Sequence, residues 1–224
     1  YFSHFADQRL YKQDIRLPGA APHPLTPPRD LRYADAVIDR SRRRLIAIRE
    51  DHTVPEQEAV NSIVALPTEG DEQNGGQILA SGNNFYSAPR LSPDGRSLAF
   101  LTWNHPNMPW DGCELWLAQL DAAGNVTGSQ KIAGGVTESI FQPEWSPDGI
   151  LHFVSDRTGW WNLYRFRAGK IEPLCPMDAE FGAPLWTFSQ HTYSFASPRR
   201  IICNFVQGGC HIASLDTQSL KLDI

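Results

Sequence analysis

The sequence predicts an all-β protein, a β-propeller of four-stranded antiparallel blades, and three observations support this fold class. The word Ser-Pro-Asp-Gly occurs at 92–95 and at 146–149, and an apolar run follows each copy. One set of apolar anchors recurs at steps of 53, 53 and 50 residues: Leu45, Leu98, Leu151 and Ile201. A second set recurs at steps of 53, 52, 48 and 49 residues: Leu10, Ile63, Leu115, Leu163 and Ile212. An internal repeat of about fifty residues is typical of propellers and arrays.

One repeat, residues 86–133, shows how each blade is built. An extended stretch at 86–91 leads into the Ser-Pro-Asp-Gly turn, where proline presets φ and glycine accepts positive φ. Apolar runs follow at 97–103 and 114–120, and a short fourth stretch lies at 130–133. Short strands separated by turn residues, without a helical period, predict an antiparallel sheet, and such sheets fan around an axis in a propeller. A β-sandwich is the alternative.

The repeat assigns residues 1–224 to one partial propeller domain with about four blades' worth of sequence. We expect blades at these approximate bounds, the first and last being partial: 1–28, 31–81, 84–134, 138–176 and 184–224. The chain enters in mid-blade and leaves after a third strand around 212–215. Either its ends share one blade and close a ring of four, or it is an arc of a ring of six to eight blades within a larger protein.

Two other turns are degenerate copies of the Ser-Pro-Asp-Gly word. Residues 39–42, Asp-Arg-Ser-Arg, stand where 92–95 stand one repeat later, and residues 196–199 precede the apolar run at 201–203. The basic run 40–44 therefore lies at a hairpin tip. We expect a solvated turn there, not a nucleic-acid patch.

Composition narrows the function classes. The chain has 41% hydrophobic residues, and no apolar run approaches the length of a membrane helix, so we expect a soluble protein with no membrane partner. A net charge of −5 argues against nucleic acid as the main partner. The four cysteines match no disulfide framework or zinc spacing. We therefore expect reduced thiols, no metal, no cofactor and a cytoplasmic location.

No catalytic residue is expected within the chain. A serine hydrolase of the α/β type requires a Gly-x-Ser-x-Gly elbow, which the sequence lacks. The seven histidines are scattered, and no serine has a setting that suggests a triad. There is also no phosphate-binding glycine loop, dinucleotide fingerprint or metalloprotease motif.

The sequence does predict a binding face. In an antiparallel blade, the loop between the second and third strands lies at the same end as the lead-in loop of the first strand, opposite the Ser-Pro-Asp-Gly turns. The loops at that end mix aromatic residues with carboxylates, which indicates a binding or docking surface: 83–86, 103–111, 138–141 and 155–161. The candidate substrate-binding residues are Glu138, Glu144, Glu180, His105, Asn107, Trp110, Asp156, Arg157, Trp160 and Trp161. Each has a structural alternative, such as packing between blades for the tryptophans.

Longer strings resemble a known family. Residues 7–11, 31–35, 49–52, 104–111 and 138–164 are similar to the propeller half of bacterial prolyl-oligopeptidase-family serine peptidases. The most similar branch is the dipeptidyl-aminopeptidase/acylaminoacyl-peptidase group. The Ser-Pro-Asp-Gly words alone are less specific, because TolB-like propellers share them. The resemblance covers nearly the whole chain.

The resemblance implies a serine exopeptidase or oligopeptidase whose N-terminal propeller caps a C-terminal α/β-hydrolase domain with a Ser-Asp-His triad. The hydrolase domain is absent from this chain and is its expected partner, together with a short peptide; a homo-oligomer stays open. The propeller of such enzymes admits short peptides and refuses folded protein. A carboxylate should hold the peptide's α-ammonium. Glu138 is the first candidate, followed by Glu144 and Glu180.

Two other functions stay open. One is a non-catalytic TolB-like propeller that serves as a protein-docking platform. The other is a propeller glycosidase or lyase, which would need clustered carboxylates in the central channel. A Gly-x-Ser-x-Gly elbow in the sequence that follows would favour the peptidase.

Overall fold

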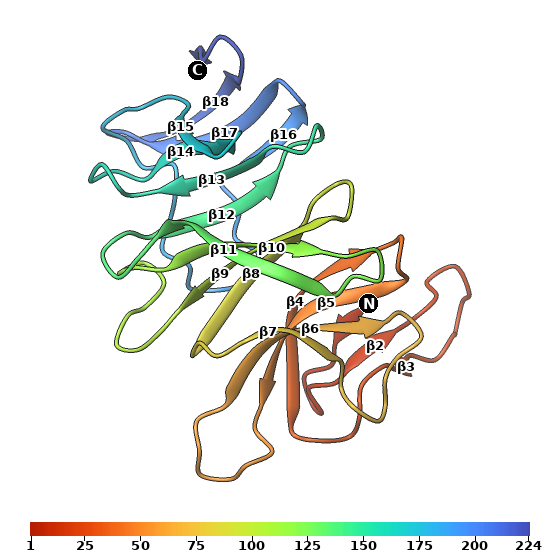
Figure 1. The fold of residues 1–224 in the computed structure, drawn as a ribbon. Coiled ribbons are helices and arrows are strands. Elements are labelled where there is room, and N and C mark those ends of the chain that lie inside the picture. The colour runs from red at the N-terminus through yellow and green to blue at the C-terminus, as the bar shows by residue number, and fades with distance from the viewer.

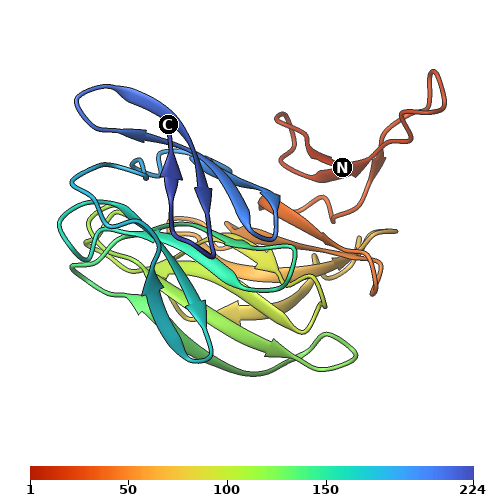
Figure 2. The same cartoon turned by 90° about the horizontal axis from the view of Figure 1, so that it is seen from above.

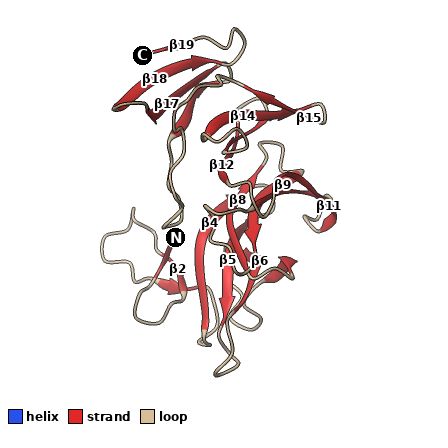
Figure 3. Cartoon of the chain, turned by 90° about the vertical axis from the view of Figure 1, so that its left-hand side faces the viewer, coloured by secondary structure: helices blue, strands red, loops and turns tan.

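The computed structural model describes residues 1–224 and consists of strands and loops without a helix (Figure 3). Nineteen strands form one three-stranded and four four-stranded sheets. The first two sheets contain β1 (Phe2–Ser3), β2 (Leu10–Lys12) and β3 (His23–Pro24), then β4 (Leu31–Asp39), β5 (Arg44–Asp51), β6 (Val60–Pro67) and β7 (Gln77–Ser81). The third contains β8 (Phe85–Leu91), β9 (Ser97–Trp103), β10 (Glu114–Leu120) and β11 (Val126–Gly134). The fourth contains β12 (Ile140–Trp145), β13 (Leu151–Ser155), β14 (Asn162–Arg167) and β15 (Lys170–Pro173), and the fifth β16 (Tyr193–Ser197), β17 (Arg200–Val206), β18 (Cys210–Asp216) and β19 (Leu222–Asp223).

The sheets fan out one after another, as Figures 1 and 2 show, and the predicted propeller fold is confirmed. Strands follow chain order within every sheet, and all neighbours are antiparallel. The first strands β4, β8 and β12 contact one another, so they lie nearest the axis. β1–β3 and β16–β19 form separate sheets, so the two ends do not share a blade.

Each pair of neighbouring sheets encloses its own apolar cluster, and four clusters separate the five sheets. In the three inner blades the second strands β5, β9 and β13 are buried on both faces, because each has a sheet on either side, whereas β17 in the last blade alternates between buried and exposed residues. In β9, Leu98 and Phe100 pack toward the second sheet, whereas Ala99 and Leu101 pack toward the fourth. This explains why the second strands of the inner blades read as continuous apolar runs. The arrangement also excludes the two-layer sandwich.

A β-bulge bends β4, β8 and β12 at an equivalent point, shown by a register shift in each strand, and β16 has its shift nearer the following turn. In the first three, the bulge residue has a positive φ: Asp35 at 48°, Ala88 at 50° and Gln142 at 47°. Asp35 Oδ2 accepts the Ala88 N–H of the next blade at 2.7 Å. Gln142 likewise donates to Tyr193 O at 2.7 Å. The strained backbone thus presents side chains that join neighbouring blades.

The last sheet differs from the expectation that the chain leaves after a third strand. A short fourth strand, β19, pairs with β18 through Ser214–Asp223 and Leu215–Leu222. The turn between them forms because Asp216 Oδ1 accepts the Gln218 and Ser219 N–H groups at 2.9 and 2.7 Å.

The structure has no helix that is long and apolar enough to cross a membrane.

The basic run 40–44 is not simply a solvated turn, so that expectation is wrong for two of its arginines. Arg42 and Arg44 are largely buried, and both donate a hydrogen bond to Asp39 Oδ2 at 2.9 Å. Arg42 also donates to Gly95 O, and Arg44 to Gly124 O, each at 3.0 Å. The run therefore links the turns of two blades.

Candidate functional site

The loops of the predicted binding face contact one another within their blades. Asn104 Oδ1 accepts the Asn84 N–H at 2.7 Å, and its amide donates to Asn83 Oδ1 at 2.9 Å. Asp156 Oδ1 accepts the Ser139 N–H at 2.7 Å. In the third and fourth sheets, the loop between the second and third strands therefore binds the lead-in loop of the same blade. Strand polarity alone predicted this arrangement.

Three candidates gather where β12 begins: Glu138, Asp156 and Arg157. Glu138 Oε1 accepts hydrogen bonds from Ser155 Oγ at 2.7 Å and from Arg157 Nε and Nη2 at 3.0 and 2.8 Å. Its Oε2 makes no hydrogen bond, and the Glu138 side chain is 22% exposed. The Arg157 guanidinium also lies over the Tyr164 ring, 5.1 Å from its centroid. The carboxylate is thus fixed by one oxygen and leaves the other available.

Asp156 adds a second carboxyl group to this cluster. Burial raises the pKa of Asp156, although the hydrogen bond from the Ser139 N–H opposes that rise. The nearby charge of Glu138 acts in the same direction as burial. With one guanidinium beside two carboxyl groups, the cluster favours an additional cation.

Glu180, Trp160 and Trp161 lie at the junction of the fourth and fifth sheets. Glu180 Oε2 accepts the Trp161 N–H at 3.0 Å. The Trp161 ring stacks on Phe141 at 5.9 Å and lies over Gly182. These contacts give Trp161 and Glu180 a structural role. Trp160 is 39% exposed and belongs to the surface.

We expect Gly182→Ala to destabilise the protein by about 1–3 kcal/mol, the usual cost of overpacking. A Cβ atom at Gly182 would lie 2.0 Å from Trp161 Cε3, so the indole must move. Gly128→Ala is the matched control, because nothing lies within 4 Å of a Cβ there. Urea unfolding of both variants measures the difference, and equal unfolding free energies would contradict this packing argument.

His105, Asn107 and Trp110 share the loop between β9 and β10. His105 Nε2 lies 2.7 Å from Glu58 Oε1, and Asn107 Nδ2 donates to Val136 O at 2.8 Å. Both residues therefore hold the loop in place. Trp110 instead meets Trp186, with ring centroids 4.2 Å apart and planes at 43°.

The two tryptophans line an apolar groove of about 520 Å³, which we call the aromatic groove. Its lining residues are Trp103, Met108, Pro109, Trp110, Leu185, Trp186, Thr187 and Phe188. Sequence reasoning does not single out the segment 185–188. The available signal is its composition, because Leu-Trp-Thr-Phe lies in the lead-in loop of the last blade, at the same end as the other candidates.

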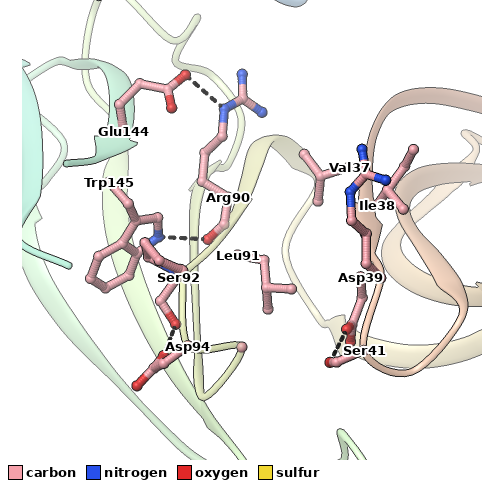
Figure 4. Close-up of a pocket in the computed structure, with 13 residues that line it drawn as sticks. Val37, Ile38, Asp39, Ser41, Arg90, Leu91, Ser92, Asp94, Glu144 and Trp145 are labelled. Carbon is pink, nitrogen blue, oxygen red and sulfur yellow. Dashed lines mark hydrogen bonds and ion pairs between the residues drawn. The ribbon is translucent and has the colours of Figure 1, made fainter. Parts of the chain in front are cut away.

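Glu144 lies apart from these residues, on the strand nearest the axis. Its Oε1 accepts from Arg90 Nε at 3.1 Å and lies 3.2 Å from His191 Nε2. Figure 4 shows Arg90 and Glu144 pointing toward each other from β8 and β12, beside a cavity of about 460 Å³. Arg90 Nη1 also approaches Asp35 Oδ1 at 3.4 Å. Glu144 therefore belongs to a charged wall at the axis, not to the loop cluster around Glu138.

Several solved structures match this chain closely. It matches a puromycin hydrolase complexed with PGG with a TM-score of 0.91 at 35% sequence identity. It matches a Mycobacterium tuberculosis puromycin-hydrolyzing peptidase with a TM-score of 0.88 at 32% identity. Each match covers 99% of this chain and 35% of the other. Over nearly its whole length the chain is therefore similar to the propeller domain of prolyl-oligopeptidase-family peptidases.

The chain thus spans about a third of the length of the puromycin hydrolases that it matches. A TolB from Acinetobacter baumannii shares the fold alone, with a TM-score of 0.55 at 17% identity over 91% of this chain and 45% of that one. No family model and no curated protein matches the sequence.

Proposed function

We propose that this prolyl-oligopeptidase-family propeller is the substrate-gating and docking part of a serine exopeptidase or oligopeptidase that acts on short peptides. Its Ser-Asp-His triad would lie in an α/β-hydrolase domain outside these residues, which is the partner of this propeller. The observation that supports the proposal is the match to puromycin hydrolases over 99% of the chain at 35% identity. The chain itself has no nucleophile elbow, which agrees with a triad elsewhere.

The gating role is supported by the strands nearest the axis. Asp35, Arg90 and Glu144 come from β4, β8 and β12 and form a connected charged network. Their side chains are 3%, 12% and 26% exposed, so the network is largely fixed by the packing around it. A rigid wall excludes folded protein by size, whereas a short peptide can pass it. The residues at the axis therefore select the peptide by size, and the residues of the loops recognise it.

Recognition of the peptide N-terminus falls to Glu138. Its free Oε2 can accept a charge-assisted hydrogen bond from an α-ammonium group. Arg157 and Ser155 hold the other oxygen, so little freedom is lost on binding. Glu180 lies at the junction of the fourth and fifth sheets, where it holds the Trp161 N–H, and Glu144 lies apart from the loops, on the strand nearest the axis. Glu138 is thus the best placed of the three carboxylates.

We expect Glu138→Gln in the full-length enzyme to lower kcat/KM for peptides with a free N-terminus by about ten- to a hundredfold, the contribution of a hydrogen bond to a charged group. The corresponding N-acetylated peptides should be hydrolysed as by the unsubstituted enzyme, because they carry no ammonium. Glu72→Gln is the control, since Glu72 is exposed. An equal loss on free and acetylated peptides would remove Glu138 from this role.

A cytoplasmic location is part of the same proposal. All four cysteines are unpaired, and three of them are buried. Burial raises the pKa of the Cys113 and Cys175 thiols to about 12, so both stay protonated and unreactive at neutral pH. Buried thiols of this kind suit a reducing compartment.

A non-catalytic docking platform of the TolB type is the second candidate. The observation that favours it is the shared fold with the Acinetobacter baumannii protein. The sequence that follows Ile224 in the gene distinguishes the two. A Gly-x-Ser-x-Gly elbow within the next few hundred residues supports the peptidase, and its absence supports the platform.

A further inference from the structure

We propose that the aromatic groove receives an aromatic side chain from the N-terminal part of the peptide whose ammonium binds Glu138. This inference rests on the proposed function and deepens it, because it names the class of peptide that the site prefers. Four features support it: the preformed walls, the exposed apolar surface, the anchoring of the segment that carries Trp186, and the position of the acidic cluster.

The walls of the groove come from two separate blades. One wall is the loop between β9 and β10, where the Trp103 ring stacks on Phe85 at 5.4 Å with an interplanar angle of 19°. The other wall is the segment between β15 and β16, which places Trp186 against Trp110. Aromatic walls of this kind offer ring faces and edges for another ring, with the offset or edge-to-face contacts that aromatic pairs prefer.

The groove keeps apolar surface in water. Trp186 is 71% exposed, Met108 53% and Phe188 40%, and the lining contains no charged side chain. A volume of about 520 Å³ lies within the range of small-molecule sites. Exposed aromatic surface in a concave site marks a place where a ligand is bound.

The segment that carries Trp186 is anchored at its far end and not by its indole. The Thr192 N–H donates to Gln142 Oε1 at 2.6 Å, and Ser189 Oγ donates to Asp35 Oδ1 at 3.3 Å. His191 meets Glu144 at 3.2 Å. In Figure 1 this segment descends from the upper sheets toward β8. The segment is therefore held in place while the surface of Trp186 stays free, which lowers the entropic cost of binding.

The acidic cluster adjoins the groove. Ser139, the residue after Glu138, donates from Oγ to Pro109 O at 2.8 Å, and Pro109 lines the groove. Asn107 fixes the same loop to Val136. A negative site therefore lies beside an uncharged apolar one. This pattern complements a peptide that carries an ammonium group and, close to it, an aromatic side chain.

The test is equilibrium binding by calorimetry to the full-length protein, with reduced-amide analogues that resist hydrolysis. The probes are Phe-Ala-Ala, Ala-Phe-Ala and Ala-Ala-Ala. We expect one of the phenylalanine probes to bind about tenfold more tightly than Ala-Ala-Ala, as one aromatic contact in an apolar site allows. Trp186→Ala should abolish this preference and leave the affinity for Ala-Ala-Ala unchanged, and Trp186→Phe should restore part of it.

Phe5→Ala is the matched control, because Phe5 is 92% exposed and lies outside the groove. Its preference should equal that of the unsubstituted protein. Equal affinity of the unsubstituted protein for all three probes would overturn the inference. So would a Trp186→Ala variant that weakens all three probes equally, the outcome expected if another domain covers the groove. A protein that shows the preference but hydrolyses no peptide contradicts only the proposed function.

Discussion

Asp39→Ala is expected to lower the free energy of unfolding by about 3–5 kcal/mol, the cost of removing one partner from a buried charge network. Asp39 is 1% exposed and accepts from Arg42 Nη1 and Arg44 Nε, each at 2.9 Å, and from Ser41 Oγ at 2.8 Å. Arg42 and Arg44 are only 15% and 9% exposed, so both guanidinium groups would remain in place without their counterion.

The ionised state of Asp39 supports this expectation. Burial alone would raise the pKa of Asp39, but hydrogen bonds from Arg42, Ser41 and Arg44 together hold it below its usual value. A carboxyl group with a lowered folded-state pKa stabilises the fold above its unfolded-state pKa, and this contribution is lost as pH falls through the folded-state value. The effect of Asp39→Ala should therefore be largest at neutral pH.

Urea unfolding at neutral pH measures the effect, with Arg43→Ala as the control from the same turn. Arg43 is 76% exposed and meets Glu69 only at 3.5 Å, so its loss should change stability by less than about 1 kcal/mol. A loss below about 1 kcal/mol for Asp39→Ala would show that the charges of this turn are screened by solvent.

The same turn explains why the repeat could be predicted from the sequence. In the regular copies, Ser92 Oγ donates to Asp94 Oδ1 and Ser146 Oγ to Asp148 Oδ1, each at 2.6 Å. In the degenerate copy, Ser41 Oγ donates to Asp39, so the serine and the aspartate have exchanged places. The bond is local and depends on two residue types at a fixed spacing. Such chemistry can be read from a sequence.

Strand bounds were predictable wherever burial imposes a pattern. The apolar runs at 97–103 and 114–120 coincide with β9 and β10. β11 extends over Val126–Gly134, well beyond the predicted 130–133, because an outer strand is largely exposed and needs no apolar pattern.

Register in a hairpin depends on turn length. Cys203 lies opposite Ala213, since three residues separate Val206 from its partner Cys210.

Contacts between blades were not predictable, because they join residues that lie far apart in the sequence. Within a blade, strand polarity predicts at which end Glu138 lies. Its hydrogen bonds with Arg157 and Ser155 depend on side-chain rotamers, which the sequence does not predict. The pairing of Trp110 with Trp186 joins loops of two blades whose relative position no local pattern sets. The repeat thus predicts where loops gather, and only packing decides which side chains meet.

His152 gives the second large expected effect, a loss of about 3 kcal/mol of unfolding free energy as pH falls from 6.5 to 4. The His152 side chain is 1% exposed in β13, its Nδ1 lies 3.0 Å from Ile150 O, and its Nε2 is buried without a hydrogen bond. Burial, and secondarily the charge of Arg165, lowers the pKa of His152 to about 4. Protonation would therefore place a charge and an unpaired N–H in the core.

The sign follows from proton binding. Between pH 6.5 and about 4 the unfolded chain binds a proton at His152 and the folded chain does not. The free energy of unfolding therefore decreases as the pH is lowered across this interval, and the contribution of His152 stays constant below pH 4. Urea unfolding from pH 7.5 to 4 should show a shallower decline for His152→Gln than for the unsubstituted protein, whatever the change at neutral pH. His23→Gln, at an exposed histidine, should retain the original slope. If His152→Gln also retained it, the acid sensitivity would belong to the paired carboxylates such as Asp39, whose stabilising contribution is lost only at lower pH.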